Sequence, residues 1–204
     1  MIPIALKKWL GIRHSCKSPN SIFIGLIGGV GDLISAAPSV AALKRKYPDA
    51  KINFGVGDGI FFNTIKNDPN IDHFETPFFY DVWKKRARRK TYREKYKEHD
   101  LVFLLDNGTQ DWWQPRKHLL DIYAEKCGVS LEERRPLIYL NDSDFEEAQK
   151  KIYELGISDK NKFLVLSPET RSKKKMKEWP YERFLLLIQK IRENHDFKII
   201  TLVS

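Results

Sequence analysis

The chain has 204 residues, of which 42% are hydrophobic and 31% are charged, and its formal net charge is +9 at pH 7. The hydrophobic content is too high for a disordered protein, and the sequence has no run of about 18 apolar residues such as a membrane-spanning helix needs. The basic balance indicates acidic partners, namely nucleic acid, anionic lipid or a phosphorylated substrate, and two distant cysteines, Cys16 and Cys127, are typical of a reduced, cytoplasmic protein.

The first predicted element is a buried strand at residues 22–27, where the apolar residues form a short, β-branched run. The helical spacing of apolar residues over 33–47 predicts a helix soon after it. The junction, where the backbone turns sharply or approaches a ligand, contains Gly28, Gly29 and Gly31. Asp32 follows them, at the carboxyl end of the strand, where open α/β sheets bind ligands. Its carboxylate has two interpretations that the residues leave open, a cap for the helix N-terminus and a catalytic group.

Strands and helices alternate along the rest of the chain. Apolar runs predict further strands at 51–56, 71–75, 101–105, 136–140, 163–166 and 197–203. Helical spacing and end signals predict helices at 60–66, 80–99, 115–126 and 141–155, and a last helix that begins at Pro180. Ser143 and Glu146 have the spacing of a capping box for the helix at 141–155. The alternation predicts an α/β fold with parallel sheets.

A polar break near residues 155–161 predicts a boundary between two such units. We therefore expect a leader segment at 1–20, an N-terminal domain at 21–157 and the beginning of a second domain at 158–204. The leader lacks the apolar core and cleavage site of a signal peptide. The second domain would contain only two strands and one helix, which cannot easily bury both faces of a sheet, so we expect it to be truncated.

Several common motifs are absent from the sequence. There is no GxxxxGK[ST], and the dinucleotide-binding pattern that begins at Gly29 lacks its third glycine because position 34 is Ile. Neither HExxH nor CxxC occurs. Asp142 and Asp144 form a DxD that could bind a metal, but they open an amphipathic helix, so capping is the better explanation.

Two segments concentrate positive charge. Residues 84–97 contain nine Lys or Arg and one Glu, which fits either a solvated helix face or a surface that faces an anion. Residues 167–180 contain a threonine hydroxyl, an arginine and several lysines between a predicted strand and a predicted helix. Such a junction suits a diphosphate, although taken alone the segment is better explained as a flexible basic loop.

Three segments in this order resemble the ADP-heptose:lipopolysaccharide heptosyltransferases, glycosyltransferase family 9. They are the glycine-rich junction with Asp32 and Pro38 at residues 28–52, the helix at 118–128, and the Thr-Arg to Lys-x-Trp-Pro segment at 170–180. The resemblance implies a GT-B architecture, in which a Rossmann-like N-terminal domain faces a second, here incomplete, Rossmann-like domain across the active site. It also implies an inverting transfer that needs no metal and no cofactor besides the nucleotide-sugar donor.

The resemblance assigns roles to single residues. Asp32 matches the family's general base, which takes the proton of the acceptor hydroxyl. The acceptor side would further include Gly29 and Gly31, and the phosphates of the donor would be bound by Thr170, Arg171 and Lys177. The family's later Asp-x-x-x-x-His and Gly-Pro-Thr segments have no counterpart before Ser204. A 204-residue form is therefore expected to bind its donor poorly, and the sequence leaves open whether that form is active.

The expected function is transfer of a heptose-like sugar, from ADP-heptose or a similar nucleotide sugar, to an anionic lipopolysaccharide-core or related acceptor. The expected location is cytoplasmic, in peripheral contact with the inner face of the inner membrane, and no nucleic acid is expected as a partner. The alternative, from a different class, is a non-catalytic basic module that binds anionic lipid or nucleic acid.

Overall fold

The computed structural model describes residues 17–78, 96–106, 117–158, 160–169 and 179–202. Its contacts divide the chain into two units, Met1–Leu140 and Asn141–Ser204. The predicted boundary lay between residues 157 and 158 and differs from this division. A helix of the second unit ends at Glu154, just before the polar break at 155–161. Ile157, within this break, is buried and lines the same hollow as Ile199 and Ile200 of the last strand.

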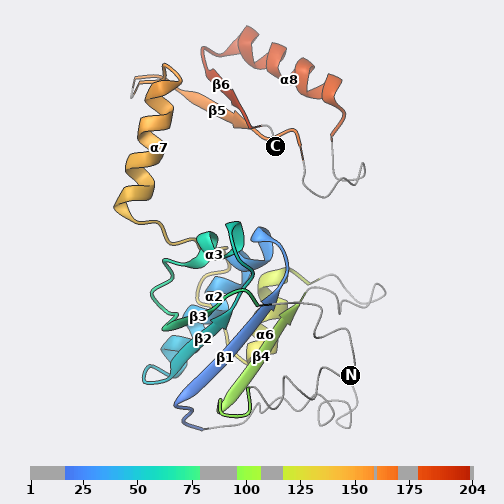
Figure 1. Ribbon diagram of the computed structural model, residues 1–204. Helices are drawn as coiled ribbons and strands as arrows, with labels where there is room; N and C mark the ends of the chain where they lie inside the picture. The colour runs from blue at the N-terminus through green and yellow to red at the C-terminus, as the bar shows by residue number, and fades with distance from the viewer. Residues whose placement is uncertain (1–16, 79–95, 107–116, 159, 170–178, 203–204) are drawn as a thin grey trace. The chain divides into compact units, whose positions relative to one another are not determined.

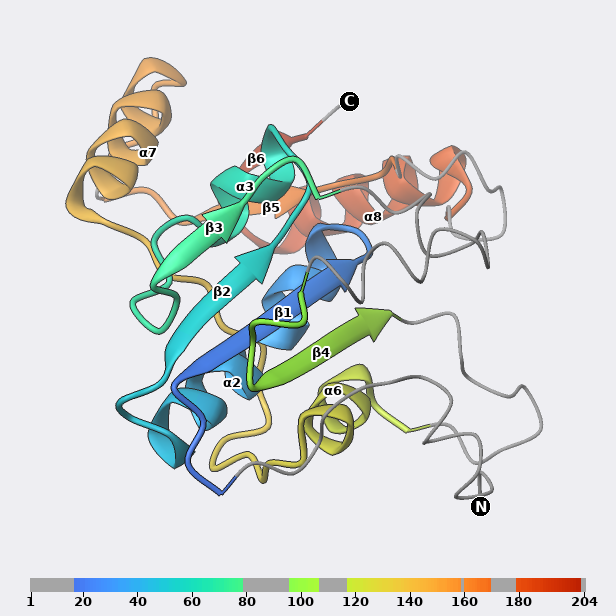
Figure 2. The same ribbon diagram turned by 60° about the horizontal axis from the view of Figure 1, so that its bottom comes forward.

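The first unit contains a parallel sheet of four strands, which Figure 2 shows. In spatial order these strands are β3 (His73–Glu75), β2 (Lys51–Gly55), β1 (Ser21–Ile27) and β4 (Leu101–Asp106). All three strand pairings are parallel, as the alternation of elements predicted. The chain builds outward from β1 through β2 to β3 and then crosses to β4 on the other side of β1. The strand order therefore reverses between β1 and β4.

Two helices, α2 (Val30–Lys46) and α6 (Leu119–Cys127), pack against each other over one face of the sheet (Figure 2). A short helix, α3 (Ile60–Ile65), packs against α2. Alternate residues of three strands turn toward α2 and α6 and are almost fully buried. They are Ile22, Ile24 and Leu26 of β1, Ile52 and Phe54 of β2, and Leu101, Phe103 and Leu105 of β4. This apolar layer holds the beginning of α2 at the edge of the sheet.

The opposite face of the sheet carries a smaller aromatic cluster. Phe23 of β1 stacks on Tyr96 with ring centroids 3.9 Å apart, and Phe78 packs against both rings. The ring of Phe78 also lies over Gly25 and Gly55, which are partners in neighbouring strands. A Cβ atom at Gly25 would stand 2.6 Å from this ring, and one at Gly55 would stand 2.8 Å from it. Glycine at both positions lets the ring reach the sheet.

Pro38 lies inside α2 and leaves a backbone carbonyl without its helical partner. Proline has no N–H, so the carbonyl of Ile34, four residues earlier, loses the donor of a regular helix. The N–H of Leu137 donates to that carbonyl at 3.0 Å instead. Nearby, the side-chain amide of Asn70 donates to the phenolic oxygen of Tyr139 at 3.1 Å. The segment at 136–140 is therefore docked on α2, and the strand predicted there is wrong.

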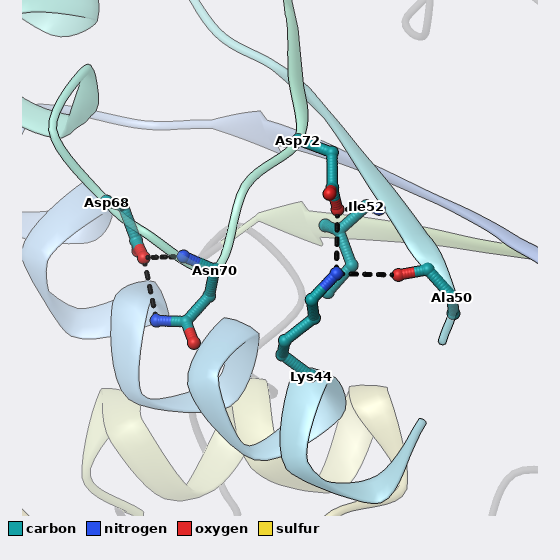
Figure 3. Close-up of polar contacts among 6 residues, drawn as sticks. All are labelled: Lys44, Ala50, Ile52, Asp68, Asn70 and Asp72. Carbon is teal, nitrogen blue, oxygen red and sulfur yellow. Dashed lines mark hydrogen bonds and ion pairs between the residues drawn. The ribbon is translucent and has the colours of Figure 1, made fainter. Parts of the chain in front are cut away.

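A polar network fastens the end of α2 to the sheet (Figure 3). The Lys44 ammonium donates to the carbonyl of Ala50 at 2.9 Å and to the carboxylate of Asp72 at 3.0 Å. Asp72 also accepts the N–H of Ile52, the second residue of β2, at 2.8 Å. These bonds tie the end of α2 to the beginning of β2.

Over its described residues, the second unit contains a two-stranded parallel sheet and two helices (Figure 1). Its elements are α7 (Asp142–Glu154), β5 (Phe163–Leu166), α8 (Tyr181–Asn194) and β6 (Lys198–Thr201). All four elements were predicted, with small differences in their ends. Neither helix, both of which are described over their whole length, contains a buried residue.

The cap of α7 differs from the predicted pair, Ser143 and Glu146. Asn141 is the N-cap, and its side-chain oxygen accepts the N–H of Asp144 at 2.9 Å. The Asp144 carboxylate accepts the N–H of Asn141, also at 2.9 Å. The capping box therefore begins two residues earlier than predicted, because asparagine is as good an N-cap residue as serine. Asp144, the second aspartate of the DxD motif, is one of the two residues of this box.

Candidate functional site

The candidate site lies where the strand order of the first sheet reverses. The register of the sheet pairs Ile27, the last residue of β1, with Asp106, the last residue of β4. Gly28 and Gly29 follow β1 directly, and α2 begins at Val30 with Gly29 as its N-cap residue. In open parallel sheets, ligands bind outside the carboxyl ends of the strands at such a reversal. The topology thus places the predicted glycines and Asp32 where a ligand is expected.

Asp32 is the third residue of α2, and its side chain folds back over the beginning of the helix. Its Oδ2 accepts the backbone N–H of Gly29 at 2.5 Å. The predicted cap interpretation placed Asp32 at the N-cap position, but Gly29 occupies that position. Asp32 therefore satisfies a backbone donor at the helix beginning from inside the first turn, where a negative charge also interacts favourably with the helix dipole.

The other oxygen of this carboxylate contacts a residue of a different helix. The phenolic O–H of Tyr123, on α6, donates to Asp32 Oδ1 at 3.3 Å. Tyr123 is fully buried in the core between the sheet and the helices. Tyr123 was not among the predicted site residues. The sequence offered one signal for it, a tyrosine on the inward face of a predicted helix. Such a tyrosine is expected to have a hydrogen-bond partner, since a buried phenol generally needs one.

The three glycines of the junction have different surroundings. A Cβ atom at Gly28 would lie 2.4 Å from Asp32 Oδ2, so any side chain there would displace the carboxylate. Gly29 supplies the N–H that Oδ2 accepts, and a Cβ atom there would meet Oδ2 at an ordinary 3.6 Å. A Cβ atom at Gly31 would meet nothing within 4 Å. Gly28, which was not among the predicted site residues, is thus the glycine on which the position of Asp32 depends.

Cys127 lies one helical turn after Tyr123 on α6. The residue is buried, and this burial raises the pKa of the thiol to about 12. The thiol is therefore protonated at neutral pH, and since the thiolate is the reactive form of cysteine, Cys127 is not a nucleophile at this site.

The predicted donor-binding residues Thr170, Arg171 and Lys177 lie outside the described residues. Their segment follows the end of β5 and precedes Trp179 and Pro180, where α8 begins. The ring of Trp179 packs edge-on against Phe184 of α8, with centroids 5.0 Å apart. The segment therefore joins a strand to a helix, as predicted.

The basic segment at 84–97 falls mostly outside the described residues as well. Of the helix predicted at 80–99, the structure describes only the end, where residues 96–98 form a turn. Within the described part of the chain, no three His, Cys, Asp or Glu side chains gather as a metal site would need. The helices described there are also too short or too polar to cross a membrane.

Solved glycosyltransferases share the fold of this chain. A glycosyl transferase family 9 protein from Veillonella parvula DSM 2008 has a TM-score of 0.62 and 15% identity, over 92% of this chain and 70% of that one. The ADP-heptose LPS heptosyltransferase II of E. coli has a TM-score of 0.55 and 12% identity, over 90% of this chain and 64% of that one. The E. coli heptosyltransferase WaaC, solved with ADP, has a TM-score of 0.52 and 14% identity, over 90% of this chain and 67% of that one.

Comparisons at the level of sequence find no counterpart: no protein-family profile and no curated protein matches the chain. At identities of 12–15% the structural likeness is one of fold. It confirms the predicted fold class, an α/β fold of GT-B type with a Rossmann-like N-terminal unit. It also agrees with the resemblance of the three sequence segments to glycosyltransferase family 9. This chain spans 64–70% of the lengths of the three solved structures.

Proposed function

We propose that this chain is an inverting glycosyltransferase in which Asp32 is the general base. The observation that carries the proposal is the position of this carboxylate. It lies at the reversal of the strand order, on a fold shared with solved glycosyltransferases, and its two oxygens accept hydrogen bonds from Gly29 and Tyr123. A helix cap needs no second donor from another helix, whereas a base has to be held within reach of the hydroxyl it deprotonates.

The proposed reaction is a single displacement. The acceptor hydroxyl attacks the anomeric carbon of the donor sugar from the side opposite the nucleoside diphosphate, and Asp32 takes the hydroxyl proton as the new bond forms. The bond from the anomeric carbon to the diphosphate oxygen breaks, and its electrons leave with the diphosphate. Thr170, Arg171 and Lys177 are proposed to stabilise the charge that develops on this leaving group. One base and one step invert the anomeric configuration.

ADP-heptose is the donor we propose. The support is the fold shared with the E. coli heptosyltransferases, one of which was solved with ADP and with ADP-2-deoxy-2-fluoro heptose. The proposed acceptor is a lipopolysaccharide-core glycolipid or a related anionic saccharide, with Gly29 and Gly31 on the acceptor side. A net charge of +9, with nine cations within residues 84–97, favours an anionic acceptor and peripheral contact with the inner face of the inner membrane.

The test compares two aspartates at the same edge of the sheet. Asp32→Asn removes the proposed base, and Asp58→Asn removes the charge of an exposed aspartate in the loop after β2. With ADP-heptose and a lipopolysaccharide-core acceptor, Asp32→Asn is expected to lower kcat by about 10²–10⁴-fold, the usual contribution of a general base. Asp58→Asn is expected to transfer sugar at the wild-type rate.

Two results would contradict the proposal. One is full transfer by Asp32→Asn. The other is a chain that neither transfers nor saturably binds a nucleotide sugar and yet binds generic polyanions with a steep dependence on salt. The second result is the signature of the alternative, a basic module for anionic lipid or nucleic acid.

A further inference from the structure

We infer that Tyr123 is a positioning residue, which holds the Asp32 carboxylate in the orientation that proton transfer requires. The inference rests on the proposed function of Asp32 and extends it to a residue 91 positions away in the sequence. It starts from a hydrogen bond between a residue of the hydrophobic core of the first unit and the proposed base.

Tyr123 combines a fully buried ring with a polar contact at the edge of the sheet. Its ring belongs to the same core cluster as Ile24, Leu33 and Leu105, which come from β1, α2 and β4. Its O–H group leaves that core and donates to Asp32 Oδ1. Since the ring is packed on all sides, the hydroxyl has a fixed position, and a fixed donor restricts the orientation of the group that accepts from it.

The carboxylate is held from two directions. The N–H of Gly29 donates to Oδ2 at 2.5 Å from the beginning of α2, and the Tyr123 hydroxyl donates to Oδ1 at 3.3 Å from α6. Two donors on different oxygens oppose rotation of the carboxylate about its Cβ–Cγ bond, which a single cap bond does not. A distance of 3.3 Å is long for an O–H···O bond, and catalytic hydrogen bonds are often long before a ligand tightens the site.

A second buried tyrosine provides a matched control. Tyr96, on the opposite face of the sheet, is 4% exposed, and its hydroxyl donates to Glu75 Oε1 at 2.8 Å. Tyr96→Phe and Tyr123→Phe therefore remove the same kind of bond, from a buried phenol to a carboxylate, in the same unit. The difference between them is that Tyr123 contacts the proposed base.

The first experiment measures kcat and KM for sugar transfer by the whole chain. Tyr123→Phe is expected to lower kcat about tenfold and to leave both KM values within about twofold, because orientation of the base matters in the transition state and not for binding. Tyr96→Phe is expected to keep the wild-type kcat. The double variant Asp32→Asn/Tyr123→Phe is expected to be as slow as Asp32→Asn alone, since Tyr123 acts through Asp32.

The outcomes separate the two proposals. If Asp32→Asn is inactive while Tyr123→Phe keeps the wild-type kcat, the role of Tyr123 is overturned and the general base stands. If Asp32→Asn keeps full activity, the general base is wrong, and the positioning role fails with it. An effect of Tyr123→Phe that adds fully to that of Asp32→Asn would also overturn the positioning role, because it would show that Tyr123 acts independently.

A second measurement does not depend on activity. In protein labelled with ¹³C-aspartate, the carboxyl resonance of Asp32 is the one that disappears in Asp32→Asn. At neutral pH this resonance is expected to shift in Tyr123→Phe and to stay unchanged in Tyr96→Phe. An identical Asp32 resonance in wild type and Tyr123→Phe would show that the hydroxyl does not hold the carboxylate and would overturn the inference.

Discussion

The position of Asp32 depends on its neighbours at the scale of single residues. Gly28 leaves the space into which the carboxylate folds, Gly29 supplies a donor from its own helix, and Tyr123 supplies one from α6. Two of these three residues, Gly28 and Tyr123, were not predicted as site residues. The sequence indicated only that Gly28 lies at a turn and that Tyr123 faces inward from a predicted helix. It did not indicate that either residue contacts Asp32, because that depends on backbone space and on a hydroxyl far away in the chain.

Gly28→Ala tests the space under the carboxylate. The added Cβ would lie 2.4 Å from Asp32 Oδ2, so we expect the variant to lose about 1–3 kcal/mol of unfolding free energy, as overpacked sites do. Gly31→Ala is the matched control, since a Cβ there meets nothing within 4 Å and alanine favours a helix. Urea denaturation of both variants measures the difference. Equal stability of Gly28→Ala and wild type would mean that Asp32 does not lie against Gly28.

Two aspartates of the first unit should respond to pH in opposite directions. Burial of Asp68 raises the pKa of its carboxyl above the ordinary 3.8, although bonds from Asn70 oppose this rise. Asp68 is 3% exposed, and its Oδ2 has no hydrogen-bond partner within the described structure. Partial burial also acts to raise the pKa of Asp72, but the N–H of Ile52 and the Lys44 ammonium outweigh it and hold that pKa below 3.8.

The signs follow from linkage. A raised pKa means that the folded state disfavours the anion, so the penalty from Asp68 is absent below pH 3.8 and grows as the pH rises past it. A lowered pKa means that the contribution of Asp72 is present above pH 3.8 and is lost as the pH falls through its lower, folded-state pKa. Above pH 3.8, Asp68→Asn should gain stability relative to wild type as the pH rises. Below pH 3.8, the stability that Asp72→Asn lacks relative to wild type should shrink as the pH falls. Urea midpoints on both sides of pH 3.8 measure both effects, and parallel curves for the two variants would contradict the assignment.

At the scale of elements, Pro38 links the helix of the candidate site to the end of the first unit. The strand prediction at 136–140 followed its apolar residues, of which Leu137 and Tyr139 are half-buried whereas Ile138 and Leu140 are exposed. The segment packs on α2 and not in the sheet, because the carbonyl that Pro38 leaves unpaired accepts the N–H of Leu137. A sequence pattern indicates that a segment is partly buried, but it does not indicate which backbone N–H donates to which carbonyl.

Pro38→Ala is expected to release this segment. The alanine restores an N–H at position 38 that competes for the Ile34 carbonyl, so the amide of Leu137 should exchange with solvent faster than in wild type. Hydrogen exchange with mass spectrometry on the peptide that contains Leu137 measures the change. Pro180→Ala, at the N-cap of α8, should leave that peptide unchanged. If Pro38→Ala also left it unchanged, the link between Pro38 and this segment would be wrong.

At the scale of the whole molecule, the fold was predictable and much of the site was not. The runs that form β1, β2 and β4 are short, apolar and followed by helical spacing, and this alternation is what a parallel α/β sheet requires. The order and spacing of the three motif segments led to the GT-B type, which the solved structures confirm. The bond between Asp32 and Tyr123 joins residues 91 positions apart, so it depends on the packing of α6 against α2 and is absent from any local pattern.

The central claim is that Asp32 catalyses an inverting transfer, and the anomeric configuration of the product tests it most directly. With an anomerically pure ADP-heptose and a lipopolysaccharide-core acceptor, the new linkage can be assigned by the one-bond carbon–proton coupling constant at the anomeric position. The account predicts a product whose configuration is opposite to that of the donor, formed by wild type and not by Asp32→Asn. A product that retains the donor's configuration, or an inverted product formed equally fast without Asp32, would contradict it.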